Sequence, residues 1–75
     1  MSGNRQDERF EVRCVALLRE TDRALLVEVD ANEYGLIPGE ACEIWLPLSQ
    51  VHEVHRTNPP TVVVTPWIAR QKGLL

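Results

Sequence analysis

Two histidines with a carboxylate between them form the segment of this sequence that could most directly do chemistry. His52 and His55 flank Glu53 and Val54, and imidazole and carboxylate groups at short spacing can bind zinc or act as general bases. On a strand, however, residues three apart point to opposite faces. The spacing also differs from the four-residue spacing that places two zinc ligands on one helical face. We therefore predict no metal site, and exposed or partly buried polar positions for both histidines.

Ser49 is the serine nearest to these histidines in the chain, and a serine nucleophile needs a base within hydrogen-bond reach. No spacing in the sequence places the two groups together, and so small a core leaves little room for a pocket that excludes water. Ser49 is better explained as a side chain that satisfies backbone groups where Pro47 interrupts a strand. We predict a protein that is not an enzyme, with no catalytic residue and no cofactor.

Cys14 and Cys42 both fall inside predicted strands. In a reducing compartment such residues behave as small buried hydrophobes, and this is the interpretation we favour. A disulfide between strands is the alternative. Two cysteines without a nearby second pair of ligands do not make a zinc site.

Charge is unevenly distributed, although the net charge is only −3. Arginines are concentrated in the first third of the chain, and the next basic residue after Arg23 is Arg56. The segment between these two residues contains six acids and no lysine or arginine: Glu28, Asp30, Glu33, Glu40, Glu43 and Glu53. Such a block is either a solvated surface or an acidic face that docks on a basic protein surface.

The docking hypothesis gains an aromatic anchor from Tyr34, which lies in the long loop of this acidic block. The predicted contact residues are Glu28, Asp30, Glu33, Tyr34, Glu40 and Glu43. The alternative is a module for single-stranded nucleic acid, in which tryptophans stack on nucleobases while arginines and a lysine contact phosphates. Its residues would be Arg13, Arg19, Trp45, Arg56, Trp67, Arg70 and Lys72. The net negative charge and the acidic block oppose this alternative, because both repel phosphates.

Five predicted strands would position these side chains, and in most of them apolar residues recur at every second position. They cover residues 10–18, 24–30, 41–47, 51–56 and 61–65. In the first strand Phe10, Val12, Cys14, Ala16 and Leu18 share the buried face, and Val15 and Leu17 suggest that its later half is covered on both sides. A tight turn at 20–23 and an irregular loop at 31–40 join the next strands.

The chain end predicts a short helix. Thr65 can cap it, Pro66 suits its first position and Gly73 can close it. So short a helix must dock on the sheet, and we expect it to do so through Trp67 and Ile68. The rings of Phe10, Tyr34, Trp45 and Trp67 are expected to anchor the packing.

A chain of 75 residues builds one small core. The pattern predicts a mainly β fold, a five-stranded antiparallel barrel of the SH3-like or OB-like kind with a short C-terminal helix. We expect residues 1–8 to form a disordered tail and residues 9–75 to form a single domain. The polar N-terminus and the lack of a long apolar run predict a cytoplasmic protein without a membrane segment, and open strand edges would allow a homodimer.

Three segments resemble a group of small, largely uncharacterised phage and mobile-element proteins. They are the aliphatic strand at 24–29, the corner Trp45-Leu46-Pro47-Leu48-Ser49-Gln50, and the end that runs from Trp67-Ile68-Ala69 to Lys72-Gly73-Leu74. The group commonly has lysine at the position of Leu48 and a short turn in place of the loop at 32–40. The resemblance carries over no catalytic or ligand residue. By analogy it implies a small inhibitor that occupies the nucleic-acid groove of a host protein, such as a defence nuclease complex.

Overall fold

The valine-rich alternating segments form six antiparallel strands in the computed structural model, which describes residues 8–36 and 41–75. The expected N-terminal tail, apart from residue 8, and the predicted turn at Pro38-Gly39 lie outside the described residues. The strands are β1 (Phe10–Arg13), β2 (Ala16–Glu20), β3 (Ala24–Asp30), β4 (Ala41–Pro47), β5 (Val51–His55) and β6 (Thr61–Val64). A 3-10 helix, η2 (Leu48–Gln50), joins β4 to β5, and α1 (Pro66–Gln71) follows β6.

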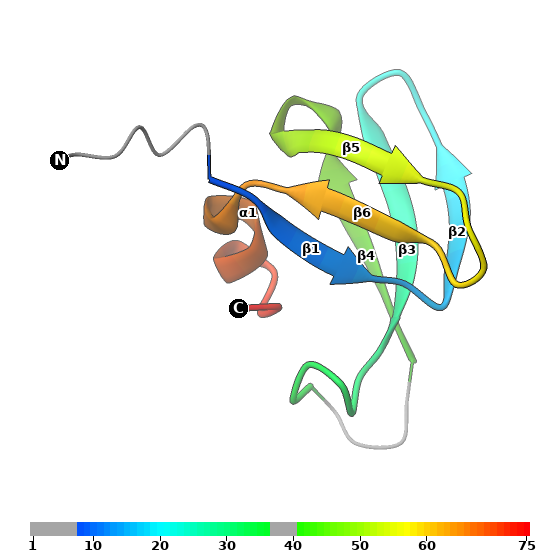
Figure 1. The fold of residues 1–75 in the computed structure, drawn as a ribbon, viewed down its shortest axis with the longest axis vertical. Coiled ribbons are helices and arrows are strands. Elements are labelled where there is room, and N and C mark those ends of the chain that lie inside the picture. The colour runs from blue at the N-terminus through cyan, green and yellow to red at the C-terminus, as the bar shows by residue number, and fades with distance from the viewer. Residues whose placement is uncertain (1–7, 37–40) are drawn as a thin grey trace, which may run out of the picture.

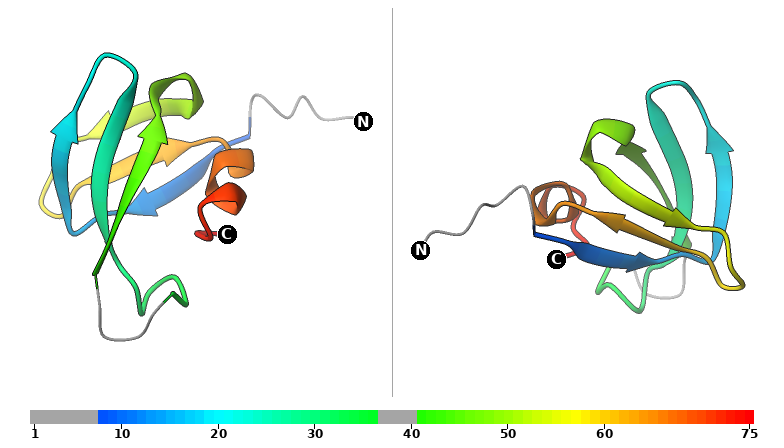
Figure 2. Two further views of the ribbon diagram at one scale, coloured as in Figure 1. Left: turned by 180° about the vertical axis from the view of Figure 1, so that it is seen from behind. Right: turned by 45° about the horizontal axis from the view of Figure 1, so that its top comes forward.

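The strands make two three-stranded sheets, with the orders β1-β6-β5 and β2-β3-β4. Figures 1 and 2 show that the strands of one sheet run across those of the other, with α1 beside the end of β6. β4 ends at Pro47, as predicted. The chain then turns through η2 into the second sheet.

The mainly β class is confirmed, the predicted count of five strands is wrong, and the predicted barrel does not close among the described residues. The first strand divides because the chain changes sheets in its middle. The Cys14 amide donates to the Pro60 carbonyl (2.9 Å), whereas the Val15 amide donates to the Glu28 carbonyl (2.6 Å). The residues from Cys14 to Leu18 are all apolar, so the pattern does not reveal this break.

The predicted faces of the first segment are also wrong in its second half. The inward side changes where the chain crosses between the sheets. Cys14 is buried, but in β2 Leu17, opposite Val27, packs against the core, whereas Ala16 stands opposite Glu28 on the other side. Leu18 follows Leu17 at a shift in the register and is exposed (43%), and Val15, at the crossing, is exposed as well (54%).

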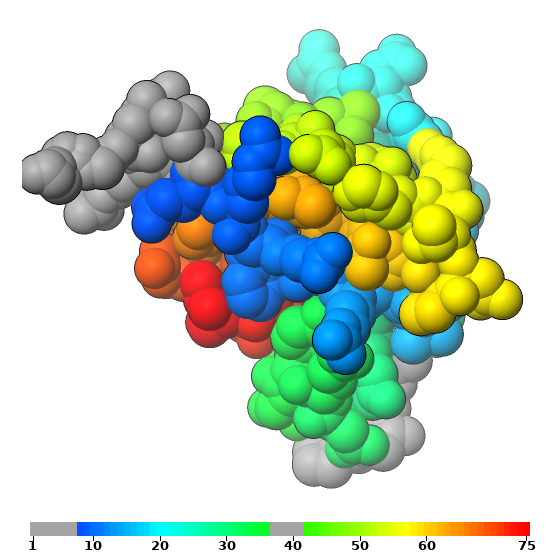
Figure 3. Space-filling model, viewed as in Figure 1, coloured from blue at the N-terminus to red at the C-terminus, as the bar shows by residue number. Residues whose placement is uncertain are grey.

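The described part of the predicted loop, residues 31–36, forms turns that fold back onto the end of β1 (Figure 3). The Tyr34 hydroxyl accepts a hydrogen bond from the Arg13 amide (2.6 Å) and donates to the Arg13 carbonyl (3.4 Å). Tyr34 and Leu36 also pack against the core. The loop is thus tied to the sheet that contains β1.

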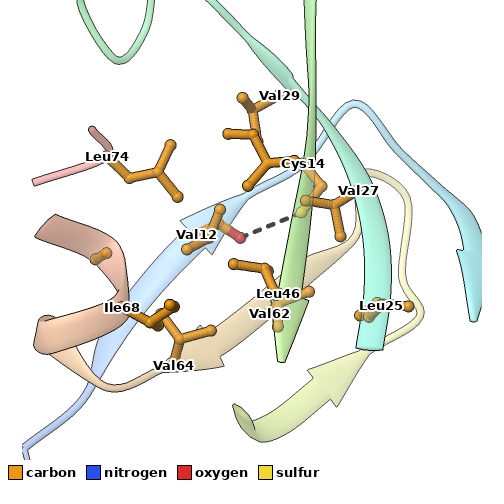
Figure 4. Close-up of a cluster of buried hydrophobic side chains, with 12 residues drawn as sticks. Val12, Cys14, Leu25, Val27, Val29, Leu46, Val62, Val64, Ile68 and Leu74 are labelled. Atoms are coloured by element: carbon orange, nitrogen blue, oxygen red, sulfur yellow. Dashed lines mark hydrogen bonds between the residues drawn. The ribbon is translucent and has the colours of Figure 1, made fainter. Parts of the chain in front are cut away.

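Both sheets and the C-terminal segment contribute to one apolar core (Figure 4). The strands β1, β3, β4 and β6 offer every second residue, as the alternation predicts. The buried cluster comprises Val12, Cys14, Leu25, Val27, Val29, Ile44, Leu46, Val62, Val64, Ile68, Ala69 and Leu74. Phe10 packs against this cluster as a partly buried residue.

The helix signals are confirmed in detail. The Thr65 hydroxyl accepts from the Ile68 amide (3.3 Å), and Gly73 takes a positive φ of 77°. The Leu74 amide donates to the Ala69 carbonyl (2.8 Å) and the Gly73 amide to the Arg70 carbonyl (3.2 Å), which is the Schellman arrangement. The expected anchor is right for Ile68 and wrong for Trp67. Trp67 is 56% exposed, and the helix docks through Ile68 and Ala69.

Within residues 8–36 and 41–75 there is no helix of the length and apolar character that a membrane crossing requires.

Candidate functional site

The side of the β2-β3-β4 sheet that faces away from the core gathers residues from both predicted sites. Leu25, Val27 and Val29 of β3 point into the core, so the residues between them point outward. We call this surface the outer face. Its members, taken from the strand register, are Ala16, Arg19, Ala24, Leu26, Glu28, Asp30, Glu43 and Trp45.

The outer face is ordered in rows across the three strands. One row contains Ala16, Glu28 and Glu43, because Glu28 pairs with both neighbours. The next row contains Arg19, Leu26 and Trp45. Two carboxylates therefore lie beside a tryptophan and a leucine on one surface.

The backbone geometry brings the two carboxylates of the first row close together. The Leu48 amide donates to the Arg23 carbonyl (2.8 Å) as an extension of the β3-β4 ladder. Because hydrogen-bonded and non-hydrogen-bonded pairs alternate along an antiparallel ladder, Glu28 and Glu43 form a non-hydrogen-bonded pair. Side chains approach most closely in such pairs, and like charges placed directly opposite destabilise the sheet.

No cation neutralises this pair from within the part of the chain that the structure describes. The ion pairs there join Arg9 to Glu53, Arg13 to Glu33, His55 to Glu53 and Arg56 to Glu20, and none involves Glu28 or Glu43. Glu28 is half-buried and Glu43 is exposed. The two glutamates thus stand opposite each other on the outer face, and neither has an ion pair among the described residues.

Trp45 gives this surface an apolar centre next to the carboxylates. It is 40% exposed and stands opposite the half-buried Leu26. A ring that is partly open to solvent beside aliphatic carbon can cover a partner side chain over a large area. From the sequence, Trp45 is expected either to stack on nucleic acid or to anchor the packing, and Leu26 is not singled out. The place of Leu26 becomes visible once the hairpin register is known.

The remaining residues of the predicted acidic set are dispersed. Asp30 lies on the outer face two residues beyond Glu28, and its carboxylate accepts a hydrogen bond from the Asn32 amide (2.9 Å). Glu33 lies in the turn and pairs with Arg13 (3.6 Å). Tyr34 is held against β1, and burial raises the pKa of its hydroxyl, an effect that the hydrogen bond with Arg13 partly opposes. Glu40 lies outside the described residues.

The predicted nucleic-acid set is also divided. The register brings Arg19 and Trp45 into one row. Arg13 is paired with an acid of the turn, and Arg56 donates to Glu20 (2.7 Å). The other members are on or next to the C-terminal helix, at Trp67, Arg70 and Lys72.

The two histidines occupy different environments. The His55 ring is exposed and lies 2.9 Å from the Glu53 carboxylate. His52 is half-buried at a bulge of β5, and its Nε2 has no hydrogen-bond partner among the described residues. No group of three or more potential metal ligands occurs within the ranges that the structure describes.

Ser49 is exposed on η2. There it is Gln50 that accepts hydrogen bonds from Thr65, at its backbone carbonyl (3.0 Å) and at its side chain (2.6 Å).

Both cysteines are free thiols in this structure. Cys14 is buried, with 3% of its surface exposed, and desolvation raises the pKa of its thiol to about 11. The predicted role as a buried hydrophobe is thus confirmed for Cys14, whereas Cys42 is only partly buried.

A scan against protein-family models finds no match to this chain. Neither the curated proteins nor the solved structures include one that matches it. Evidence on the function of this chain therefore comes from the geometry of the outer face.

Proposed function

We propose that this chain is a non-enzymatic binding protein whose outer face docks on a basic surface of another protein. The observation that carries the proposal is the cross-strand pair of Glu28 and Glu43, neither of which has an ion-pair partner among the described residues. Opposed like charges destabilise the free sheet. A lysine or arginine of a partner, placed between the two carboxylates, would turn that repulsion into attraction on binding.

The neighbouring row supports the same function. Interfaces commonly combine an aromatic anchor with charged groups at its border. Trp45 and Leu26 would supply the anchor, and Glu28, Glu43 and Asp30 the border. Electrostatic complementarity of this kind speeds association and selects basic partners.

The resemblance to small phage and mobile-element proteins suggests a biological setting for this proposal. A host protein that binds nucleic acid presents a basic groove, and an acidic surface can occupy such a groove. We therefore propose an inhibitor of a host nucleic-acid-binding or defence complex, acting in the cytoplasm.

Single-stranded nucleic acid is the second candidate ligand, and one observation favours it. Arg19 and Trp45 share a row, so a base could stack on the ring while the guanidinium contacts a phosphate. The neighbouring carboxylates of Glu28 and Glu43 oppose this arrangement, since they repel the phosphate backbone.

Affinity capture tests the proposal. The immobilised chain is exposed to a bacterial lysate and compared with the double variant Glu28→Lys plus Glu43→Lys. The matched control is Glu11→Lys plus Asp22→Lys, which makes the same charge change at exposed positions away from the outer face. We expect the wild-type chain and the control to retain one basic protein in equal stoichiometry, and the double variant to lose it.

A titration with labelled single-stranded DNA and RNA at low salt separates the two candidates, because phosphate contacts are strongest there. Submicromolar binding that Trp45→Ala abolishes would replace the protein-binding proposal with the nucleic-acid one. Retention of the basic protein by the double variant would also contradict the proposal.

A further inference from the structure

The two sheets have four edge strands, and three of them carry features that prevent further strand pairing. β1 has only four residues, while β2 and β5 are interrupted by register shifts at Leu17/Arg19 and Val51/Glu53. Short length and bulges are the usual means by which sheets protect their edges. β4 differs, since its seven residues pair with β3 in one unbroken register from Ala41 to Pro47.

The free side of β4 presents unpaired backbone groups next to the residues of the outer face. Cys42, Ile44 and Leu46 belong to the hydrogen-bonded pairs of the ladder, so their amides and carbonyls point to β3. The backbone groups of Glu43 and Trp45 consequently point away from β3. Figure 2 (left) shows β4 at the margin of its sheet, and no further strand pairs with it among the described residues.

We infer that the edge of β4 binds an extended basic segment of the partner by strand addition. This inference deepens the proposed function and rests on it. In an added strand, every second side chain lies on the outer face, next to Glu43 and then next to Trp45. A basic residue at the first position would meet Glu43 and Glu28, and a guanidinium at the second could lie over the Trp45 ring. The segment recognised is therefore one with basic residues at alternate positions.

Charge complementarity favours this occupant over a second copy of the chain. Glu43 lies near the middle of β4, and symmetric antiparallel pairing of two such edges would bring the acidic rows of both copies together. A charged residue within an edge strand is a common device against self-pairing. The net charge of −3 adds repulsion between copies.

Amide exchange measured by NMR on the labelled full chain tests the inference. The probe is a peptide of seven residues that alternates valine and arginine, the length of β4, and the control peptide alternates valine and glutamate. We expect the arginine peptide to slow exchange of the Glu43 and Trp45 amides at least about tenfold. We expect no such protection from the glutamate peptide, or with Glu43→Lys protein.

Two further peptides keep the arginine sequence but are N-methylated, one at the arginines and the other at the valines. Alternate amides of a strand point to opposite sides, so strand addition predicts that one pattern abolishes the protection and the other preserves it. Protection that both patterns preserve would overturn the inference.

Three other outcomes would each rule out strand addition by a partner. Binding that perturbs the Glu28 and Glu43 side-chain signals without protecting the β4 amides would overturn strand addition and leave the proposed function standing. Absence of any binding would overturn the inference, while the capture experiment would still judge the proposed function separately. Protection in the free protein that rises with protein concentration would assign the edge to a second copy.

Discussion

At the scale of single residues, the outer face retains an arrangement that weakens the free protein. Glu28 and Glu43 face each other in a close cross-strand pair without a cation within salt-bridge distance in the described chain. Elsewhere in that chain, carboxylates such as Glu20 and Glu53 do have basic partners. Under the proposed function, a cation of the partner between Glu28 and Glu43 would remove their repulsion on binding.

We expect Glu28→Gln to raise the free energy of unfolding by about 0.2–1 kcal/mol, since it removes the repulsion from Glu43. Urea unfolding at low salt measures the change, and Glu11→Gln, on the other sheet, serves as the control with no expected gain. A loss of stability in Glu28→Gln would mean that the pair is not repulsive.

The buried thiol of Cys14 predicts a loss of stability in alkaline solution. Its folded-state pKa is about 11, against an ordinary value of 9.0, so the folded state favours the neutral thiol. The stabilisation is fully present below pH 9 and is lost as the pH rises toward 11. Chemical unfolding across this range should show a steeper decline for the wild-type chain than for Cys14→Ala. Parallel declines for wild type and Cys14→Ala would contradict the assignment.

At the scale of elements, the C-terminal helix depends on how it ends. Gly73 adopts φ of 77°, and a Cβ there would lie 3.4 Å from Cδ2 of Leu36. Gly35 has a similar φ of 70°, but a Cβ would meet open space. We expect each substitution to alanine to cost about 1 kcal/mol through the left-handed backbone, with Gly73→Ala the more harmful. Thermal unfolding of the two variants checks this, and equal or reversed losses would show that the Leu36 contact contributes nothing.

Most elements could be predicted because their signals are local. The strand over 24–30, the stop at Pro47 and the cap, first proline and terminal glycine of α1 each depend on neighbouring residues. The break between Cys14 and Val15 could not be predicted, because the residues from Cys14 to Leu18 are all apolar and so do not show that the chain changes sheets and its inward side there. The exposure of Trp67 was missed for a related reason, since the side of a two-turn helix that meets the sheet is decided by tertiary packing.

The candidate site could be predicted only in part. Acid positions are visible in the sequence, but the pairing of Glu28 with Glu43 and the dispersal of Glu33 and Tyr34 toward β1 follow from strand register and from hydrogen bonds distant in the chain. No residue pattern in the sequence marks β4 as an edge strand, because an edge strand is defined by the absence of a second neighbouring strand.

At the scale of the whole molecule, one small core carries the stability of both sheets. A chain of this length is expected to have a free energy of unfolding of about 4–11 kcal/mol. Leu46 is fully buried, and its truncation to alanine should cost about 2–5 kcal/mol. Urea unfolding of Leu46→Ala, compared with the exposed Leu18→Ala, measures this. Similar losses in the two variants would contradict the assignment of Leu46 to the core.

According to the proposed function, negative charge on the outer face selects a basic protein partner. Reversing that charge should therefore reverse the preference for a partner. Binding of the valine-arginine and valine-glutamate peptides is measured by calorimetry, against both the wild-type chain and Glu28→Lys plus Glu43→Lys. We expect the wild-type chain to bind the arginine peptide with at least about tenfold higher affinity than the glutamate peptide. We expect the double variant to bind the glutamate peptide more tightly. An unchanged preference for the arginine peptide in a folded double variant would contradict the proposed function.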